Sequence, residues 1–316
     1  MWKGWPDARR PDVSDTAAIN ETTRNDQAVL RARAETEAAR FPPLLAEAER
    51  LAATIILGDH GRRQAGMGET FWQYRRAEAG DAFSAIDWRR SARSDRLYIR
   101  QTEWEAAQSV AFWVDPSAAM AYQSNLADVS KAYRASLLAL VLAIGLNRGD
   151  ERFSLIGTAA GVAKTGQRQV EMMAAELSRP AGDGDYGAPP LTRFAAGSRA
   201  VFLSDFLGPR DGLISQIGQA ADQGVRGCLL QVLDPAEEAF PFDGRTVFTS
   251  MSGALRYETD RARSLKSAYQ ARLAERQDEL RDLARRTGWT FAVHHTDTPP
   301  RVPLLWLNNA IAGFRR

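Results

Sequence analysis

Two aspartates follow apolar segments that have the length and composition of buried strands. Asp115 follows the run at residues 110–114, and the polar pair Ser204-Asp205 follows the run at residues 200–203. In an open parallel sheet, ligands bind beyond the carboxyl ends of the strands, where the strand order reverses. If the two segments are neighbouring strands, Asp115, Ser117 and Asp205 converge on one crevice. Their oxygen atoms are the kind of ligand that Mg²⁺ or Mn²⁺ prefers.

The same residues also suit a purely structural role. Asp-Pro-Ser after a strand is a common turn, and Asp or Ser at that place often caps the next helix. Asp234-Pro235 ends another apolar run in the same way, with no metal role indicated. The spacing alone therefore leaves a cation site and a capping turn both open.

The elements that must position these residues follow an alternating pattern. We expect strands at 110–114, 152–156, 200–203, 228–233 and 290–293, and helices at 128–147, 167–177, 213–221, 260–286 and 304–311. Short apolar strands separated by helices predict an α/β fold with a mostly parallel sheet covered on both faces. The glycine-containing stretch 180–187 is expected to form an exposed, flexible loop.

The pattern divides the chain into three parts. Residues 1–43 are polar and predict an N-terminal arm. Residues 44–107 predict a helix at about 44–56, ended by Gly58 and Gly61, and then a small β unit punctuated by glycines. Residues 108–316 carry the α/β pattern.

Composition is that of an ordinary globular protein. The 316 residues carry a formal net charge of +2 and a single cysteine, Cys228, which excludes an intrachain disulfide. The longest apolar run, 135–146, is shorter than the roughly 20 residues that span a bilayer, so it predicts a buried helix. No signal peptide is recognised at the start. We therefore expect a soluble, cytoplasmic protein without a membrane span.

Arginine is concentrated between residues 61 and 101, where nine arginines face five acids, with Trp72, Tyr74 and Trp88 interleaved. Three interpretations remain open for this segment. Internal ion pairing is favoured, followed by docking of an acidic partner through Arg89, Arg90 and Arg93. Binding of single-stranded nucleic acid is the least favoured, because the acids offset much of the charge and no nucleic-acid-binding motif is present.

Catalytic motifs are absent from the sequence. The three histidines form no metal-binding or triad pattern, and there is no phosphate-binding loop or Gly-x-Ser-x-Gly. The sequence therefore favours a protein that is not an enzyme. The alternative is a Mg²⁺-dependent phosphoryl-transfer hydrolase with Asp115 as nucleophile. Such an enzyme needs a lysine near a later strand end, and none of the four lysines is obviously placed there.

Several motifs in a fixed order also carry a family resemblance. They are Gly66-Met67-Gly68-Glu69, Gly80-Asp81, Ile86-Asp87-Trp88, Ser91-Ala92-Arg93, Asp115-x-Ser117 with Met120, Ser204-Asp205-Phe206, and Asp234-Pro235 with Glu237 and Glu238. Over about residues 44–312 the chain resembles a bacterial family of von Willebrand factor A-like proteins of unknown function.

This resemblance implies a fold and a way of working. The fold is a Rossmann-like three-layer von Willebrand A sandwich with a mostly parallel sheet, preceded by a small β-containing unit. Proteins of this kind are encoded beside MoxR-type AAA+ ATPases, which implies an adaptor or assembly role with such an ATPase, and other von Willebrand A-like proteins as further partners.

The resemblance also implies a metal-ion-dependent adhesion site in weakened form. Asp115, Ser117 and Asp205 match three of its ligands, and Thr192 is the candidate for the threonine ligand. Ala119 stands where the family's loop has a second serine, and alanine cannot coordinate a metal. We therefore expect Mg²⁺ or Mn²⁺ to bind weakly or not at all, and a contact surface that depends little on a cation.

Overall fold

The computed structural model describes residues 43–59, 71–76, 86–92, 97–102, 109–195 and 197–313. The chain divides into two compact units, Met1–Pro43 and Leu44–Arg316. The predicted arm at 1–43 lies outside the described residues, apart from its last residue. The motif residues 66–69 and 80–81, and Arg93, also lie outside them.

Four described elements, α2, β1, α3 and β2, precede the main sheet in the chain. Helix α2 (Pro43–Asp59) runs past Gly58, which we expected to end it, and buries Leu45 and Ala48 in the core of the α/β body. Strand β1 (Phe71–Arg76) pairs in antiparallel fashion with β2 (Tyr98–Thr102), and the short helix α3 (Trp88–Ser91) precedes β2. The predicted small β-containing unit is therefore confirmed.

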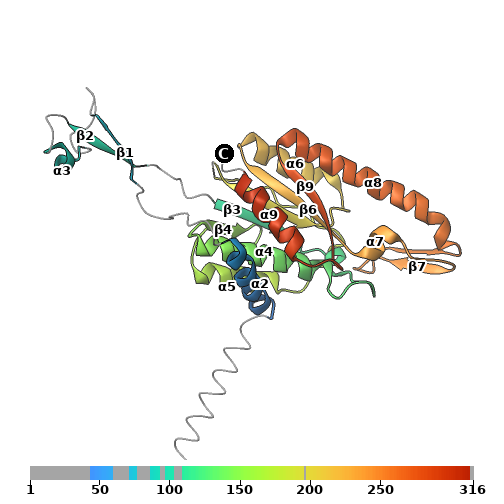
Figure 1. Cartoon of the computed structure of the whole chain (residues 1–316). Coiled ribbons are helices and arrows are strands. Elements are labelled where there is room, and N and C mark those ends of the chain that lie inside the picture. The colour runs from blue at the N-terminus through green and yellow to red at the C-terminus, as the bar shows by residue number, and fades with distance from the viewer. Residues whose placement is uncertain are drawn as a thin grey trace, which may run out of the picture. The chain divides into compact units, whose positions relative to one another are not determined.

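The central sheet has five parallel strands in the order β4-β3-β5-β6-β9 (Figure 1). Its strands are β3 (Ser109–Val114), β4 (Arg152–Leu155), β5 (Arg199–Ser204), β6 (Arg226–Leu233) and β9 (Thr290–His295). The helices that connect them are α4 (Lys131–Arg148), α5 (Gln167–Leu177), α6 (Arg210–Asp222) and α8 (Ala262–Thr287), and α9 (Arg301–Gly313) follows the last strand. Outside the named strands, Phe153 of β4 forms an isolated antiparallel bridge with Lys164.

The apolar core forms two layers, one on each face of the sheet. On β3, Val110 and Phe112 point into a cluster formed with α2, α4, α5 and α9. The alternate residues Ala111 and Trp113 point into a second cluster formed with α6 and α8. Successive side chains of a strand face opposite sides of the sheet, so each strand holds both helical layers. The predicted three-layer α/β sandwich with a mostly parallel sheet is confirmed.

Helix α4 lies in the middle of this core, and every side chain from Lys131 to Ile144 except Ala132 and Tyr133 is buried. Its apolar stretch was interpreted as a buried helix because it is too short to span a bilayer. Within the described segments, no helix combines the length and the apolar character that crossing a membrane requires.

Two features beside the sheet were not predicted. Helix α7 (Pro235–Ala239) follows β6 directly, and β7 (Thr246–Thr249) and β8 (Arg256–Thr259) form an antiparallel hairpin beyond it (Figure 1). Phe240 packs against Phe248 of β7 and Tyr269 of α8, with ring centroids 5.7 and 5.0 Å away. Packing of these rings holds the hairpin against helix α8 of the α/β body.

Candidate functional site

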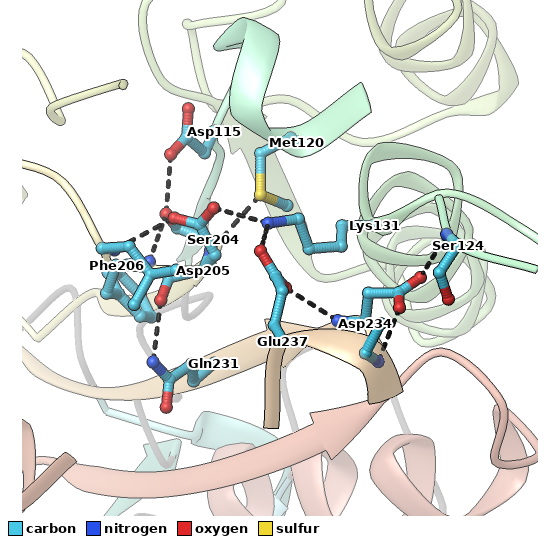
Figure 2. A network of polar contacts seen from close by, with 12 residues as sticks. Asp115, Met120, Ser124, Lys131, Ser204, Asp205, Phe206, Gln231, Asp234 and Glu237 are labelled. Atoms are coloured by element: carbon cyan, nitrogen blue, oxygen red, sulfur yellow. Dashed lines mark hydrogen bonds and ion pairs between the residues drawn. The ribbon is translucent and has the colours of Figure 1, made fainter. Parts of the chain in front are cut away.

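The order of the strands creates a switch point between β3 and β5. The chain leaves β3 toward β4 on one side, and β5, β6 and β9 follow on the other side. The crevice outside the carboxyl ends of two such strands is the usual binding place in an open α/β sheet. Asp115 and Asp205 directly follow these two strands, and Figure 2 shows the polar network around them.

Asp115 is held by hydrogen bonds from its own loop and from the neighbouring strand. Its Oδ2 accepts a hydrogen bond from Ser204 Oγ at 2.6 Å, and its Oδ1 accepts one from the backbone N–H of Ser117 at 2.9 Å. Only 3% of Asp115 is exposed, and this burial raises its pKa despite the hydrogen bonds. The predicted strand-end turn is therefore present, and it locks the carboxylate in place.

Asp205 has partners in its own loop, in β6, in α4 and in the segment that follows β3. Its Oδ1 accepts from the backbone N–H of Leu207 at 3.0 Å, and its backbone oxygen accepts from Gln231 Nε2 at 2.8 Å. Its backbone N–H lies 3.3 Å from Met120 Sδ (Figure 2). Its Oδ2 lies 2.7 Å from the ammonium nitrogen of Lys131.

Lys131 is the residue that the sequence interpretation missed. Its ammonium group contacts both Asp205 and Glu237 Oε1, the latter at 2.6 Å, and only 1% of its side chain is exposed. Burial works to lower the pKa of Lys131, but the two carboxylates raise it overall, so the lysine remains charged. A lysine does lie at this strand end, contrary to our expectation for the four lysines.

Glu237 reaches Lys131 because helix α7 is capped in a defined way. Asp234 Oδ1 accepts from the backbone N–H of Ala236, and Glu237 Oε2 accepts from the backbone N–H of Asp234, each at 2.9 Å. This is a capping box, which satisfies free donors at a helix start. The remaining oxygen of Asp234 accepts from the N–H of Ser124 at 2.8 Å. The cap thus fixes both α7 and the loop before α4.

The loop at 180–187 is exposed, as predicted, and it is bonded to the site. The N–H of Gly182 donates to the Pro116 carbonyl at 2.7 Å, and the N–H of Ala118 donates to the Gly184 carbonyl at 2.8 Å. At Gly187 a Cβ atom would lie 2.1 Å from Asp115 Oδ1. The backbone of this loop therefore covers the Asp115 carboxylate.

These contacts decide how far the predicted metal ligands come together. Asp115, Ser117 and Asp205 lie at one end of the sheet, but Asp205 is ion-paired with Lys131. The hydroxyl of Thr192 donates to the Pro190 carbonyl at 3.0 Å, outside this network. The backbone N–H of Ala119 donates to the Asp185 carbonyl, and its side chain has no ligand atom.

As they stand, these residues do not fit a divalent cation. The Lys131 ammonium group lies against the Asp205 carboxylate, which would bind the ion. Of the two other ligand positions that the resemblance implies, Ala119 has no side-chain oxygen, and the Thr192 hydroxyl is bonded to Pro190. Across the described segments, no group of three or more His, Cys, Asp or Glu side chains could hold a metal. The buried hydroxyl of Ser117 has no hydrogen-bond partner among the residues that the structure describes.

The arginine segment is described only in part. Arg89 and Arg90 lie in α3, where Arg89 is exposed beside Trp88, which is also exposed. Arg93 lies outside the described residues. Partner docking through these arginines stays a prediction.

A cavity of about 210 Å³ lies beside the Lys131 network. Its charged lining is Lys131 with Asp185, Asp205 and Glu237, which is one positive group against three negative ones. Its aromatic lining is Tyr122, Tyr186, Phe240, Phe242, Phe248 and Tyr269. Hairpin residues 249–251 close one side. The site is thus an acidic, aromatic hollow.

The chain matches one protein family and has low sequence identity to several solved structures. A family model described as "Protein of unknown function DUF58" matches residues 73–279. Among solved structures, the conserved hypothetical protein BatB from Bacteroides thetaiotaomicron is 13% identical, with a TM-score of 0.41, over 66% of this chain and 98% of its own. An aerotolerance-related membrane protein from Bacteroides fragilis is 12% identical, with a TM-score of 0.40, over 65% and 99%. No curated protein matches the chain.

Proposed function

Because the chain belongs to the DUF58 family of proteins of unknown function, we propose a role for it from its own site. We infer that it is a non-catalytic protein-binding module that uses the carboxyl end of the sheet, a remnant of a metal-ion adhesion site, as its contact face. The partner that we propose is a MoxR-type AAA+ ATPase. The buried free thiol of Cys228 suits the reducing cytoplasm that we propose as its location.

The observation that carries this proposal is the apolar surface around the acidic hollow. On the β7–β8 hairpin, Met251 is 46% exposed, Leu255 is 63% exposed, and Tyr257 is also exposed. Tyr186, from the loop that covers Asp115, is exposed at the rim of the same hollow. Clustered aromatic and apolar side chains beside a pocket are typical of protein-binding surfaces.

The charge of the hollow indicates what the partner inserts. Three carboxylates against one lysine, within a ring of aromatic side chains, favour a cationic group over a carboxylate. We propose that the partner places an arginine or lysine side chain in the hollow while its apolar residues cover the hairpin.

The same geometry disfavours the phosphoryl-transfer alternative. A nucleophilic Asp115 must reach the substrate, but its two oxygens accept hydrogen bonds from Ser204 and Ser117, and the backbone at Gly187 lies against them. The lysine of the site contacts Asp205 and Glu237. No observation therefore favours hydrolysis over binding.

The test is a binding measurement with the purified MoxR-type ATPase from the same genome. We expect Met251→Asp and Leu255→Asp to weaken binding about tenfold or more, since each places a charge in the apolar contact. Val162→Asp is the matched control, because Val162 is 65% exposed and follows β4, an edge strand that two strands separate from β6, the strand before the hairpin. Equal binding by all three variants would refute the proposed face.

A further inference from the structure

We propose that the ammonium group of Lys131 takes the place of the divalent cation at this site, so that the site is assembled without a metal. Asp205 Oδ2 and Glu237 Oε1 lie 2.7 and 2.6 Å from the same nitrogen atom. Two carboxylate oxygens from different elements thus converge on one positive centre. Metal sites gather oxygen ligands around an ion in the same way.

The position of Lys131 shows that it does not serve helix α4. It is the first residue of that helix, and the first turn contains no acidic residue. A positive charge at a helix start opposes the helix dipole, and burying an ammonium group removes its hydration. Both effects destabilise the fold, so the lysine is kept in place by the two carboxylates that it joins.

Those carboxylates belong to the elements that build the binding face. Asp205 follows β5, and Glu237 is in α7, which follows β6. Lys131 therefore ties α4 to two neighbouring strand ends, as an ion would. The Tyr122 ring, whose centroid is 5.8 Å from the ammonium nitrogen, covers it from the loop before α4.

Replacement of the metal ion by the Lys131 ammonium group also explains why the set of metal ligands is incomplete. Ala119 has no coordinating atom and the Thr192 hydroxyl bonds to Pro190, but an ammonium group needs only three acceptors. A cation-independent site loses nothing when these two ligands are absent. The inference concerns the ion and not the partner, so it stands or falls separately from the proposed function.

The experiment compares three forms of the full chain in thermal unfolding, in EDTA and in Mn²⁺. We expect the wild-type Tm to be the same in both. Lys131→Ala leaves the buried carboxylate of Asp205 and the partly buried one of Glu237 without their cationic partner, and we expect its Tm in EDTA to fall by about 6–20 °C. Mn²⁺ should enter the vacated space and recover roughly half of that loss or more.

Lys131→Met is the matched control, because it removes the charge but fills the space. We expect it to lose stability without recovery by Mn²⁺. A saturable rise of the wild-type Tm with Mn²⁺ would overturn the proposal, and so would a Lys131→Ala protein whose Tm ignores Mn²⁺.

If Lys131→Ala fails to fold, NMR of the wild-type protein tests whether Mn²⁺ binds at the site. Mn²⁺ broadens the signals of nuclei near its binding site. We expect the backbone signals of Ser117, Lys131 and Asp205 to remain sharp when Mn²⁺ is added. Selective broadening of these three signals would show a bound ion and refute the inference.

Discussion

Gly187→Ala gives the sharpest test of how the loop at 180–187 controls the site. The added methyl group would lie 2.1 Å from Asp115 Oδ1 and 2.7 Å from its Cγ, so the carboxylate or the loop must move. Movement of the carboxylate breaks its 2.6 Å hydrogen bond with Ser204, and both groups are buried.

The size of the effect follows from these contacts. A buried polar group that loses its partner costs about 1–3 kcal/mol. In a body of this size, about 1 kcal/mol corresponds to roughly 2–4 °C in Tm. We therefore expect Gly187→Ala to lower the Tm by roughly 2–12 °C, measured by calorimetry or circular dichroism.

Gly182→Ala is the matched control within the same loop. A Cβ atom there would lie 3.5 Å from the Pro116 carbonyl oxygen, which is an ordinary contact, so we expect a change of about 1 °C or less. In a Ser204→Ala background the cost of Gly187→Ala should shrink, because the hydrogen bond is already lost. Unchanged melting of Gly187→Ala, or an equal loss in Gly182→Ala, would show that the loop does not press on Asp115.

Three further predictions concern residues around the site. Burial lowers the pKa of His294 to about 3, and Arg134 adds to this, so the folded protein holds the histidine neutral. Below the ordinary histidine pKa of about 6.5, only the unfolded chain takes up this proton. The free energy of unfolding should therefore fall by about 1 kcal/mol from pH 6.5 to 5.5 and keep falling toward pH 3. In urea unfolding, the free energy of unfolding of His294→Gln should depend less on pH than that of the wild type. Burial raises the pKa of Cys228 to about 12, so a thiol reagent at pH 8 should react only on unfolding, and rapid labelling of the native protein would contradict its burial. Asp234→Ala removes the acceptor for the N–H groups of Ala236 and Ser124 and should cost about 1–2 kcal/mol in denaturant unfolding, whereas Asp243→Ala, at an exposed position, should cost little.

The parallel sheet could be predicted because its strands carry an unusually clear pattern. Residues 110–114 and 200–203 are continuous apolar runs, which is typical of strands that are covered on both faces. The β7–β8 hairpin lacks this pattern. Its few apolar residues stand among Arg256, Glu258 and threonines, and most of its residues are exposed. Its position depends on Phe240 and Tyr269, whose contact is visible only in three dimensions.

The site was only half predictable for a similar reason. Asp115 and Asp205 are marked by their places after strands, whereas Lys131 begins a helix 16 residues after Asp115 and bonds to residues from distant parts of the chain. Its rarity was the available indication, since it is one of four lysines in a chain rich in arginine. Thr192 was assigned from a proline-rich stretch with no periodic pattern, and its hydroxyl bonds locally to Pro190.

The residues of the Lys131 network are far apart in the sequence, and this limits when the proposed binding face can form during synthesis. Lys131 bonds to residues 74 and 106 positions away, and Ser124 bonds to Asp234 across 110 positions. A chain emerging from the ribosome cannot close this network until α7 has been made, and closing such long loops is slow. A chain that ends before α7 therefore does not present the complete face that we propose for binding.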